Sequence, residues 1–199
     1  MPKTSKQCEV IKEERRNAII EESLHLFCLE GFADVSVDDI CNKLKISHGL
    51  FYHYFTNKED VQKAVFEKAK LLMDKQFQNI DISKKGLDFI AQFNHYSLMC
   101  LRQGKLYAYY IYFTLDTAVN NRMVIKDKAK PSNRLLIEAI KTSQKNHQVI
   151  NGDYMEIYFT YLSLLKGLAY SVIKSKKQTD YIIPEDEIPM NLFYKKEIK

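Results

Sequence analysis

The sequence predicts an all-α protein with two domains, and three observations support this prediction. The chain has 199 residues, of which 46% are hydrophobic, so it can bury a sizeable core. It contains only six Gly and four Pro, which argues against a turn-dense β fold. Apolar side chains recur at helical spacing, and no segment shows convincing strand alternation. We expect an N-terminal three-helix domain over 1–56 and a helical domain over 57–199.

Three helices are expected in the first domain, at about 11–30, 36–44 and 48–54. Gly31 suits the C-cap of the first helix, and Phe32 is placed to fold back onto it as an apolar contact. Ser36 and Ser47 suit the N-caps of the other two, because a serine hydroxyl accepts hydrogen bonds from the free amides of a helix start. A longer helix followed by two short ones is the helix-turn-helix arrangement.

The second domain is expected to begin with a long helix from Asn57 to about Ile80. Asn57 and Asp60 form its start signal. Gly and Pro breakers then separate further helices, expected at about 84–103, 105–118, 132–147, 153–175 and 186–197. The polar segment 119–131 ends in proline and is expected to be a mobile connection.

Charge and cysteine usage narrow the class of protein. The net charge is +5, and the stretch 42–58 contains lysines and histidines but no acid, so it should face the phosphates if the protein binds DNA. The N-terminus lacks the apolar core of a signal peptide, and no apolar stretch is long enough to span a bilayer. The four cysteines are scattered without a C-x-x-C pair. We therefore expect a cytoplasmic chain with reduced thiols, no metal site, no cofactor and no membrane partner.

Several short motifs follow one another in a specific order between residues 16 and 65. They are Gly31-Phe32, Ser36-Val37 before Asp39-Ile40, Ile46-Ser47, Gly49, the aromatic block from Phe51 to Phe55, and Asn57-Lys58-Glu59. In this order and spacing the stretch resembles the DNA-binding region of the TetR family of bacterial transcriptional regulators. The resemblance implies a homodimer that binds a double-stranded DNA operator and responds to a small-molecule effector.

The expected DNA-binding residues each have a chemical reason. Gly49 has no side chain, so its helix can approach the duplex closely, and Tyr52 can donate to a phosphate oxygen. Phe51 and Phe55 share one face that would lock the helix into the core. The full expected set is Ser36, Lys45, Ser47, His48, Gly49, Leu50, Tyr52, His53 and Lys58.

Some of these residues have a second interpretation. Lys58 begins a helix, where its ammonium and the free amides could hold a phosphate together, a contact that the resemblance also implies. Lys45 stands where the family often has glycine, so either the turn needs no positive φ or Lys45 adopts one with strain. Ser36 is a helix cap first, and His53 could instead be a solvated surface residue. Leu50 stands where a polar residue is common, so the operator sequence does not follow from the motif.

Aromatic residues concentrate in the second domain, with five between residues 107 and 113. They could simply fill a core without tryptophan, but many tyrosine hydroxyls in a dry core would lack partners, which favours a ligand pocket. Asp116 could select a cationic ligand or could be an exposed residue near a helix end. The expected pocket residues are Phe93, Tyr96, Met99, Tyr109, Tyr110, Phe113, Asp116, Tyr158, Tyr161 and Leu165.

A stripe of small residues on the helix at 153–175 predicts a dimer interface, because small side chains let another helix come close. The resemblance implies that the last two long helices of each subunit form this interface, although Pro184 and Pro189 interrupt the second one. The expected interface residues are Thr160, Ser163, Leu164, Gly167, Ser171, Leu192 and Phe193.

Three functions are compatible with these features. The leading hypothesis is a ligand-responsive repressor released from a pseudo-palindromic operator by a small, largely apolar or aromatic ligand. A DNA-binding scaffold whose helical body binds a protein partner is the alternative. An enzyme is disfavoured, because no nucleophile–base pair, paired carboxylates or Gly-rich phosphate loop stands out.

Overall fold

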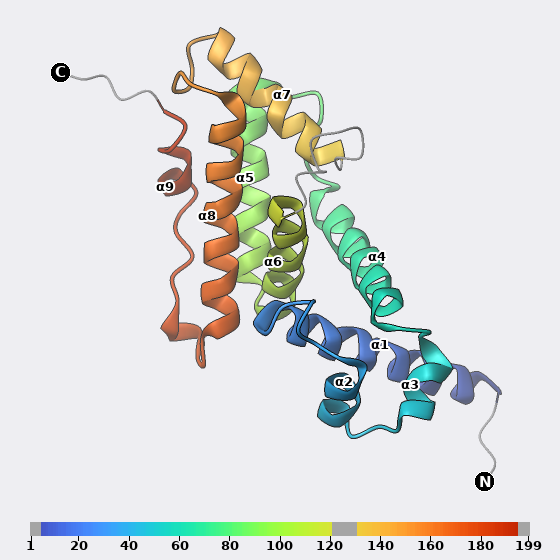
Figure 1. The fold of residues 1–199 in the computed structure, drawn as a ribbon. Helices are drawn as coiled ribbons and strands as arrows, with labels where there is room; N and C mark the ends of the chain where they lie inside the picture. Colours follow the sequence, from blue (N-terminus) through green and yellow to red (C-terminus); the bar gives the residue numbers. More distant parts are fainter. Residues whose placement is uncertain (1–4, 121–130, 195–199) are drawn as a thin grey trace. The chain divides into compact units, whose positions relative to one another are not determined.

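The computed structural model describes residues 5–120 and 131–194 (Figure 1). Every regular element in these two ranges is helical, which confirms the predicted all-α class. The expected mobile connection at 119–131 lies almost wholly outside the described residues. The chain divides into two compact units, one through Leu71 and one from Leu72. None of the described helices is long and apolar enough to cross a membrane.

The first unit contains three helices and the beginning of a fourth. They are α1 (Ser5–Leu29), α2 (Val37–Leu44), α3 (His48–Tyr54) and α4 (Lys58–Phe77). The predicted boundary lay before residue 57, but the compact unit also takes in the first turns of α4. The reason is packing, since Val61 and Val65 of α4 are fully buried in its core with Leu24, Ile40 and Phe51.

Local signals set the end of α1 and the starts of α2 and α3 as predicted, whereas α1 begins at Ser5, before the predicted start near residue 11. Gly31 follows α1 with φ of 94°, a left-handed conformation that glycine adopts without steric cost. The Phe32 ring then packs edge-on against Phe27, with ring centroids 5.1 Å apart. Ser36 and Ser47 cap α2 and α3, accepting hydrogen bonds from the third residue beyond them.

The second unit is a bundle of four longer helices with a largely irregular C-terminal segment. The helices are α5 (Gly86–Arg102), α6 (Lys105–Asn120), α7 (Pro131–Lys145) and α8 (Tyr154–Lys174), and the end of α4 precedes them. α8 packs along α6, and α5 packs along α7 (Figure 1). Fully buried side chains at their contacts include Phe89, Leu98, Tyr110, Leu136, Tyr158 and Tyr161.

The C-terminal segment departs from the prediction of a helix at 186–197. After a 3-10 turn at Gln178–Asp180, the only helix is the short α9 (Glu187–Met190), and residues 195–199 lie outside the described range. Pro184 lies in irregular chain before α9, and Pro189 lies inside its single turn. A proline lacks the N–H of a longer helix and disfavours helical geometry in the preceding residue. We call residues 181–194 the C-terminal strap.

Candidate nucleic-acid interface

The N-terminal end of α3 presents a small, solvent-exposed group of polar side chains. Ser47 has extended backbone, and its Oγ accepts a hydrogen bond from the Leu50 amide at 3.2 Å. His48 and Gly49 follow it and are exposed. A Cβ added at Gly49 would meet only Ser47 Oγ, at 4.0 Å, so nothing within the first unit requires glycine there. The open space above Gly49 leaves room for the close approach of another molecule.

The aromatic block divides between core and surface. Phe51 and Phe55 are buried at 0% and 3% exposure, and they hold α3 against the first unit as predicted. Tyr52 is 55% exposed and His53 is also exposed, on the outer side of the helix. Leu50 is half-buried. The hydroxyl of Tyr52 is therefore placed where an external acceptor could reach it.

The turn between α2 and α3 contains a lysine with positive φ. Lys45 has φ of 54° and ψ of 44°, the left-handed conformation that was one of its two predicted options. Its amide donates to the carbonyl of Asn42 at 3.2 Å, and the Ile46 amide donates to that of Cys41 at 3.0 Å. These bonds satisfy carbonyls at the end of α2 and leave the exposed Lys45 side chain facing outward.

Ser36 is engaged with α2 through both its hydroxyl and its amide. Its Oγ donates to Asp39 Oδ2 at 2.5 Å and accepts from the Asp39 amide at 3.1 Å. The Ser36 amide also donates to Asp39 Oδ2, at 2.8 Å. Hydrogen bonds from the Ser36 side chain, and then from its backbone, lower the pKa of Asp39. Because the hydroxyl proton is directed to Asp39, Ser36 acts here as a cap.

Lys58 has a different use from the expected phosphate contact. Its Nζ donates to the carbonyls of Phe32, Ala33 and Val35, at 2.8, 3.1 and 2.8 Å. The ammonium also lies 4.6 Å from the centroid of the Phe32 ring. All three donors of the ammonium are thus directed at the loop between α1 and α2. This arrangement corrects the expected role, because Lys58 ties that loop to the start of α4.

The structure contains an exposed ion pair that the sequence pattern does not predict. His48 Nε2 lies 3.3 Å from Asp38 Oδ1, with both side chains more than half exposed. The two residues are ten positions apart, and only the turn at Lys45 brings them together. No periodic signal in the sequence links them. Asp38 adds a negative charge beside the expected DNA-binding residues, which His48 offsets when it is protonated.

The predicted pocket residues are mostly core residues in the described structure. Tyr96 and Tyr109 are half-buried, Met99 is 36% exposed, and the side chain of Asp116 lies outside the described set. The other six are almost wholly buried: Phe93, Tyr110, Phe113, Tyr158, Tyr161 and Leu165. They come from α5, α6 and α8, so the fold brings most of the predicted group into one bundle.

Two of the buried tyrosines differ in how their hydroxyls are satisfied. The hydroxyl of Tyr161 donates to Asn94 Oδ1 at 3.1 Å. That of Tyr158 has no hydrogen-bond partner among the described residues. Burial raises the pKa of Tyr158 to about 12, and burial also raises the pKa of Tyr161. The buried Tyr161 hydroxyl is thus satisfied within the protein, whereas the buried Tyr158 hydroxyl has no partner among the described residues.

A groove of about 230 Å³ lies elsewhere, between the start of α8 and the C-terminal strap. Its walls include Glu156, Ile157, Thr160, Tyr161, Leu192 and Phe193. Only Tyr161 belongs to the predicted pocket. Three others, Thr160, Leu192 and Phe193, belong to the predicted dimer interface.

The small-residue stripe on α8 faces solvent in the single chain. Thr160, Ser163, Gly167 and Ser171 are exposed, and Leu164 is half-buried. A Cβ added at Gly167 would meet nothing within 4 Å, so the chain's own packing leaves this glycine uncovered.

The two strap residues of the expected interface differ in their exposure to solvent. Leu192 is 45% exposed, whereas Phe193 is fully buried. The Phe193 ring packs on Tyr161 at 5.2 Å between centroids, and its carbonyl accepts from the Ile150 amide at 2.7 Å. Phe193 therefore anchors the strap within its own chain, which corrects its assignment to an interface helix.

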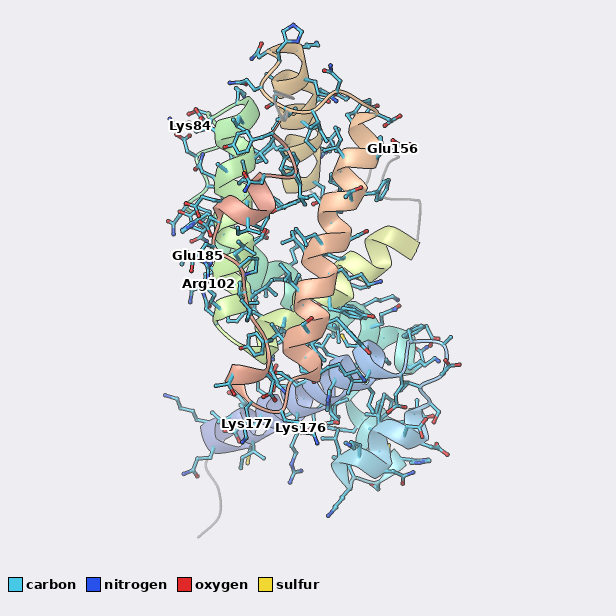
Figure 2. All side chains as sticks on the ribbon, turned by 90° about the vertical axis from the view of Figure 1, so that its left-hand side faces the viewer. Lys84, Arg102, Glu156, Lys176, Lys177 and Glu185 are labelled. Atoms are coloured by element: carbon cyan, nitrogen blue, oxygen red, sulfur yellow. The ribbon has the colours of Figure 1, made fainter. Side chains whose placement is uncertain are left out.

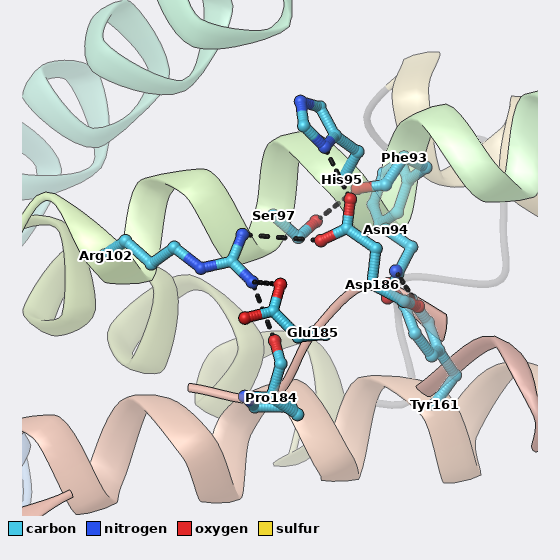
Figure 3. A network of polar contacts seen from close by, with 9 residues as sticks. All are labelled: Phe93, Asn94, His95, Ser97, Arg102, Tyr161, Pro184, Glu185 and Asp186. Carbon is cyan, nitrogen blue, oxygen red and sulfur yellow. Dashed lines mark hydrogen bonds and ion pairs between the residues drawn. The ribbon is translucent and has the colours of Figure 1, made fainter. Parts of the chain in front are cut away.

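A polar network fastens the middle of the strap to α5 (Figure 3). Asp186 pairs with His95 at 2.5 Å and with Arg102 at 3.3 Å. Its carbonyl accepts from Asn94 Nδ2 at 2.9 Å, and Arg102 also donates to the carbonyl of Pro184 at 2.8 Å. The buried Asn94 thus links the strap to Tyr161 of α8.

The sequence is similar to several known regulators. Residues 19–65 match the family model described as bacterial regulatory proteins, tetR family. The chain is 27% identical over 136 residues to the HTH-type transcriptional regulator HbdR of Aromatoleum sp. (strain CIB), a match that covers 65% of this chain and 57% of that protein. It is 26% identical over 194 residues to the HTH-type transcriptional regulator SrpR of Pseudomonas putida, covering 86% of this chain and 81% of that protein.

The fold is also similar to solved structures. One is the ketosteroid transcriptional regulator KstR2 of Mycobacterium tuberculosis, with a TM-score of 0.61 and 13% sequence identity. The match covers 92% of this chain and 96% of that one. At this identity the likeness concerns the fold, and it extends across both units.

Proposed function

Because this chain belongs to the TetR family of bacterial regulatory proteins, we propose that it is a homodimeric, cytoplasmic repressor of transcription. In this proposal a small, largely apolar or aromatic ligand releases it from a pseudo-palindromic DNA operator. The relatives reported above are named as transcriptional regulators, so catalysis has no part in the proposal.

One observation carries the DNA-binding part of the proposal. Ser47, His48, Gly49 and Tyr52 lie exposed on a short helix whose inner face, at Phe51, is buried. A rigid core thus supports a polar helix start that can enter a major groove, where only the first turns of a recognition helix make contact. Lys45 adds a positive charge at the preceding turn. Lys58 is left out because its ammonium is directed inward.

Two copies of α3 are needed to read a pseudo-palindrome. In a dimer they would contact successive major grooves about 34–36 Å apart. The exposed face of α8 is the surface we assign to dimer contact, because its small residues are uncovered in the single chain.

Ligand control would act through α4, which is covalently continuous from the first unit into the second. A ligand changes DNA affinity only if it binds the DNA-competent and DNA-incompetent dimers with different affinity. The aromatic helices α5, α6 and α8 supply an apolar environment, and the Tyr158 hydroxyl, without a partner among the described residues, could hydrogen-bond a polar group on the ligand.

Titration of the purified protein against the DNA upstream of its own gene tests the proposal. We expect saturable binding that is lost on a shuffled fragment of the same composition and that weakens steeply with salt. The double variant Ser47→Ala/His48→Ala should lose this selectivity, while Lys145→Ala, on the exposed end of α7, should retain it. Equal affinity for the two fragments would refute the repressor function.

A further inference from the structure

An ion pair joins α2 to the end of α3 that the proposed function assigns to DNA. Asp38 lies in the first turn of α2, and His48 is the first residue of α3. His48 Nε2 lies 3.3 Å from Asp38 Oδ1, and the two side chains are 54% and 70% exposed. A carboxylate therefore stands beside the first turn of the helix whose start would enter a major groove.

The two carboxylates in the first turn of α2 have different partners. Asp39 accepts from the hydroxyl and the amide of Ser36, at 2.5 and 2.8 Å, and so completes the cap of α2. Asp38 takes no part in that cap and lies against α3 instead. The start of α2 is thus closed by Asp39, and the charge of Asp38 acts at the DNA-binding surface.

A carboxylate at this position opposes binding to any duplex. DNA without the operator sequence is held almost wholly by the attraction of basic side chains to phosphates. The exposed Lys43 and Lys45 supply such charges in the same stretch of chain, and the negative charge of Asp38 offsets part of their effect. An operator is also held by contacts to base edges, which do not depend on this attraction. The charge of Asp38 therefore falls hardest on binding to unrelated DNA.

The same carboxylate determines how the His48 ring is held. A carboxylate has no hydrogen to donate, so the ring nitrogen that faces it, Nε2, is the one that carries a hydrogen. Nδ1 is then the ring nitrogen left for an external group. A side chain already held on one side loses less conformational freedom when it makes a further contact. The ion pair thus prepares His48 for one directed contact to a base.

We propose that Asp38 is a specificity-determining residue of the DNA-binding surface, and that it acts on base contact as a positioning residue for His48. Its charge weakens the attraction of this surface for the phosphates of unrelated DNA, and its ion pair holds the imidazole for contact with a base of the operator. This inference rests on the proposed function of α3. It adds to that function a residue of α2 that repels the DNA backbone.

Removal of the charge of Asp38 tests the first part of this inference. Asp38→Asn should raise the affinity for a shuffled DNA fragment about fivefold and make the salt dependence of that binding steeper by about one, because one negative charge no longer opposes the phosphates. Affinity for the DNA upstream of the protein's own gene should change less than about twofold, since weaker positioning of His48 offsets the gain. Fluorescence anisotropy with both fragments over a range of salt concentrations measures these changes.

Two controls separate this effect from a change in net charge or in folding. Asp38→Glu keeps the charge and should retain the wild-type selectivity. Glu185→Gln removes the same charge from an exposed residue of the C-terminal strap, in the second unit, and should leave both affinities unchanged (Figure 2). A weakened start of α2 would lower binding to every fragment. A gain in affinity for unrelated DNA therefore cannot come from loss of structure.

A double-mutant cycle tests the positioning of His48. His48→Gln should lower the ratio of operator affinity to unrelated affinity about tenfold in the wild-type chain, but only about threefold in Asp38→Asn, where the ring is no longer held. Equal losses in the two backgrounds, or an Asp38→Asn variant that binds unrelated DNA as the wild type does, would overturn this inference and leave the proposed function standing. A wild-type protein that binds both fragments equally would contradict the proposed function itself.

Discussion

The ammonium of Lys58 binds backbone carbonyls of its own chain, although its position in the sequence indicates a phosphate contact. At the start of α4 it has the charge and location of a phosphate ligand. The loop after α1, however, presents three carbonyls within 3.1 Å of Nζ. Lys45 differs from Lys58, because its side chain is exposed and free to contact DNA, while its backbone adopts the disfavoured left-handed conformation.

Replacing Lys58 by Met should destabilise the protein by about 1–2 kcal/mol, since charge-assisted bonds to the carbonyls are lost and partial exposure moderates the cost. Urea unfolding measures this change. The salt dependence of DNA binding should stay as in the wild type, whereas Lys45→Gly should lower its slope by about one. If Lys58→Met instead lowered this slope, the result would show that Lys58 contacts a phosphate.

Lys45→Gly should also stabilise the protein by about 0.5–1 kcal/mol, because glycine adopts a φ of 54° without the steric cost that lysine bears. Thermal unfolding is the measurement. Lys43→Gly is the matched control and should destabilise by about 1 kcal/mol, because residue 43 lies within α2. A loss of stability in Lys45→Gly would mean that the lysine stem makes compensating contacts.

Tyr52→Phe should weaken binding to specific and unrelated DNA alike, by about fivefold, as expected for one lost hydrogen bond to a phosphate. Fluorescence anisotropy with both fragments gives the two affinities. Tyr154→Phe, in the second unit, serves as the control. If only the specific fragment were affected, Tyr52 would read a base rather than the backbone.

At the scale of elements, the C-terminal strap takes the place of the helix that the sequence predicted after residue 186. Its course is set by two long-range attachments, the Asp186 network on α5 and the Phe193 ring on α8. Each attachment joins residues that are more than thirty positions apart in the chain. A helical pattern after Pro184 was therefore a poor guide to the structure of this segment.

Phe193→Ala should destabilise the protein by about 3 kcal/mol, because it empties a fully buried aromatic site. It should also expose the strap to limited proteolysis between Lys177 and Tyr194. Tyr194→Ala, at a neighbouring residue that is 43% exposed, should change neither property. Equal stability of the two variants would show that the strap contributes little to the fold.

At the scale of the whole molecule, the proposed function requires two copies of α3, because each chain has one such helix and the proposed operator is a pseudo-palindrome. If this proposal holds, dimer formation and operator binding are coupled equilibria. A substitution on α8, in the second unit, should lower DNA affinity because it dissociates the dimer, even though the first unit is unaltered.

Gly167→Leu places a large side chain where an added Cβ now meets nothing within 4 Å, so the monomer should fold normally. The dimer should dissociate, and the DNA-binding curve should become steeper in protein concentration with a weaker midpoint. Sedimentation and anisotropy follow the two effects. Lys145→Leu, which adds a leucine at the exposed end of α7, should alter neither. An intact Gly167→Leu dimer would show that this face of α8 lies outside the interface.

The sequence by itself determined the helices of the first unit, their caps at Ser36 and Ser47, the division of the aromatic block, and the family of the N-terminal domain. These features depend on residues within a few positions of one another, where spacing and capping chemistry act directly. The tertiary structure alone decided the use of Lys58, the pairing of His48 with Asp38, the burial of Phe193 and the path of the strap. Those outcomes come from contacts between distant segments, whose geometry exists only once the chain has folded.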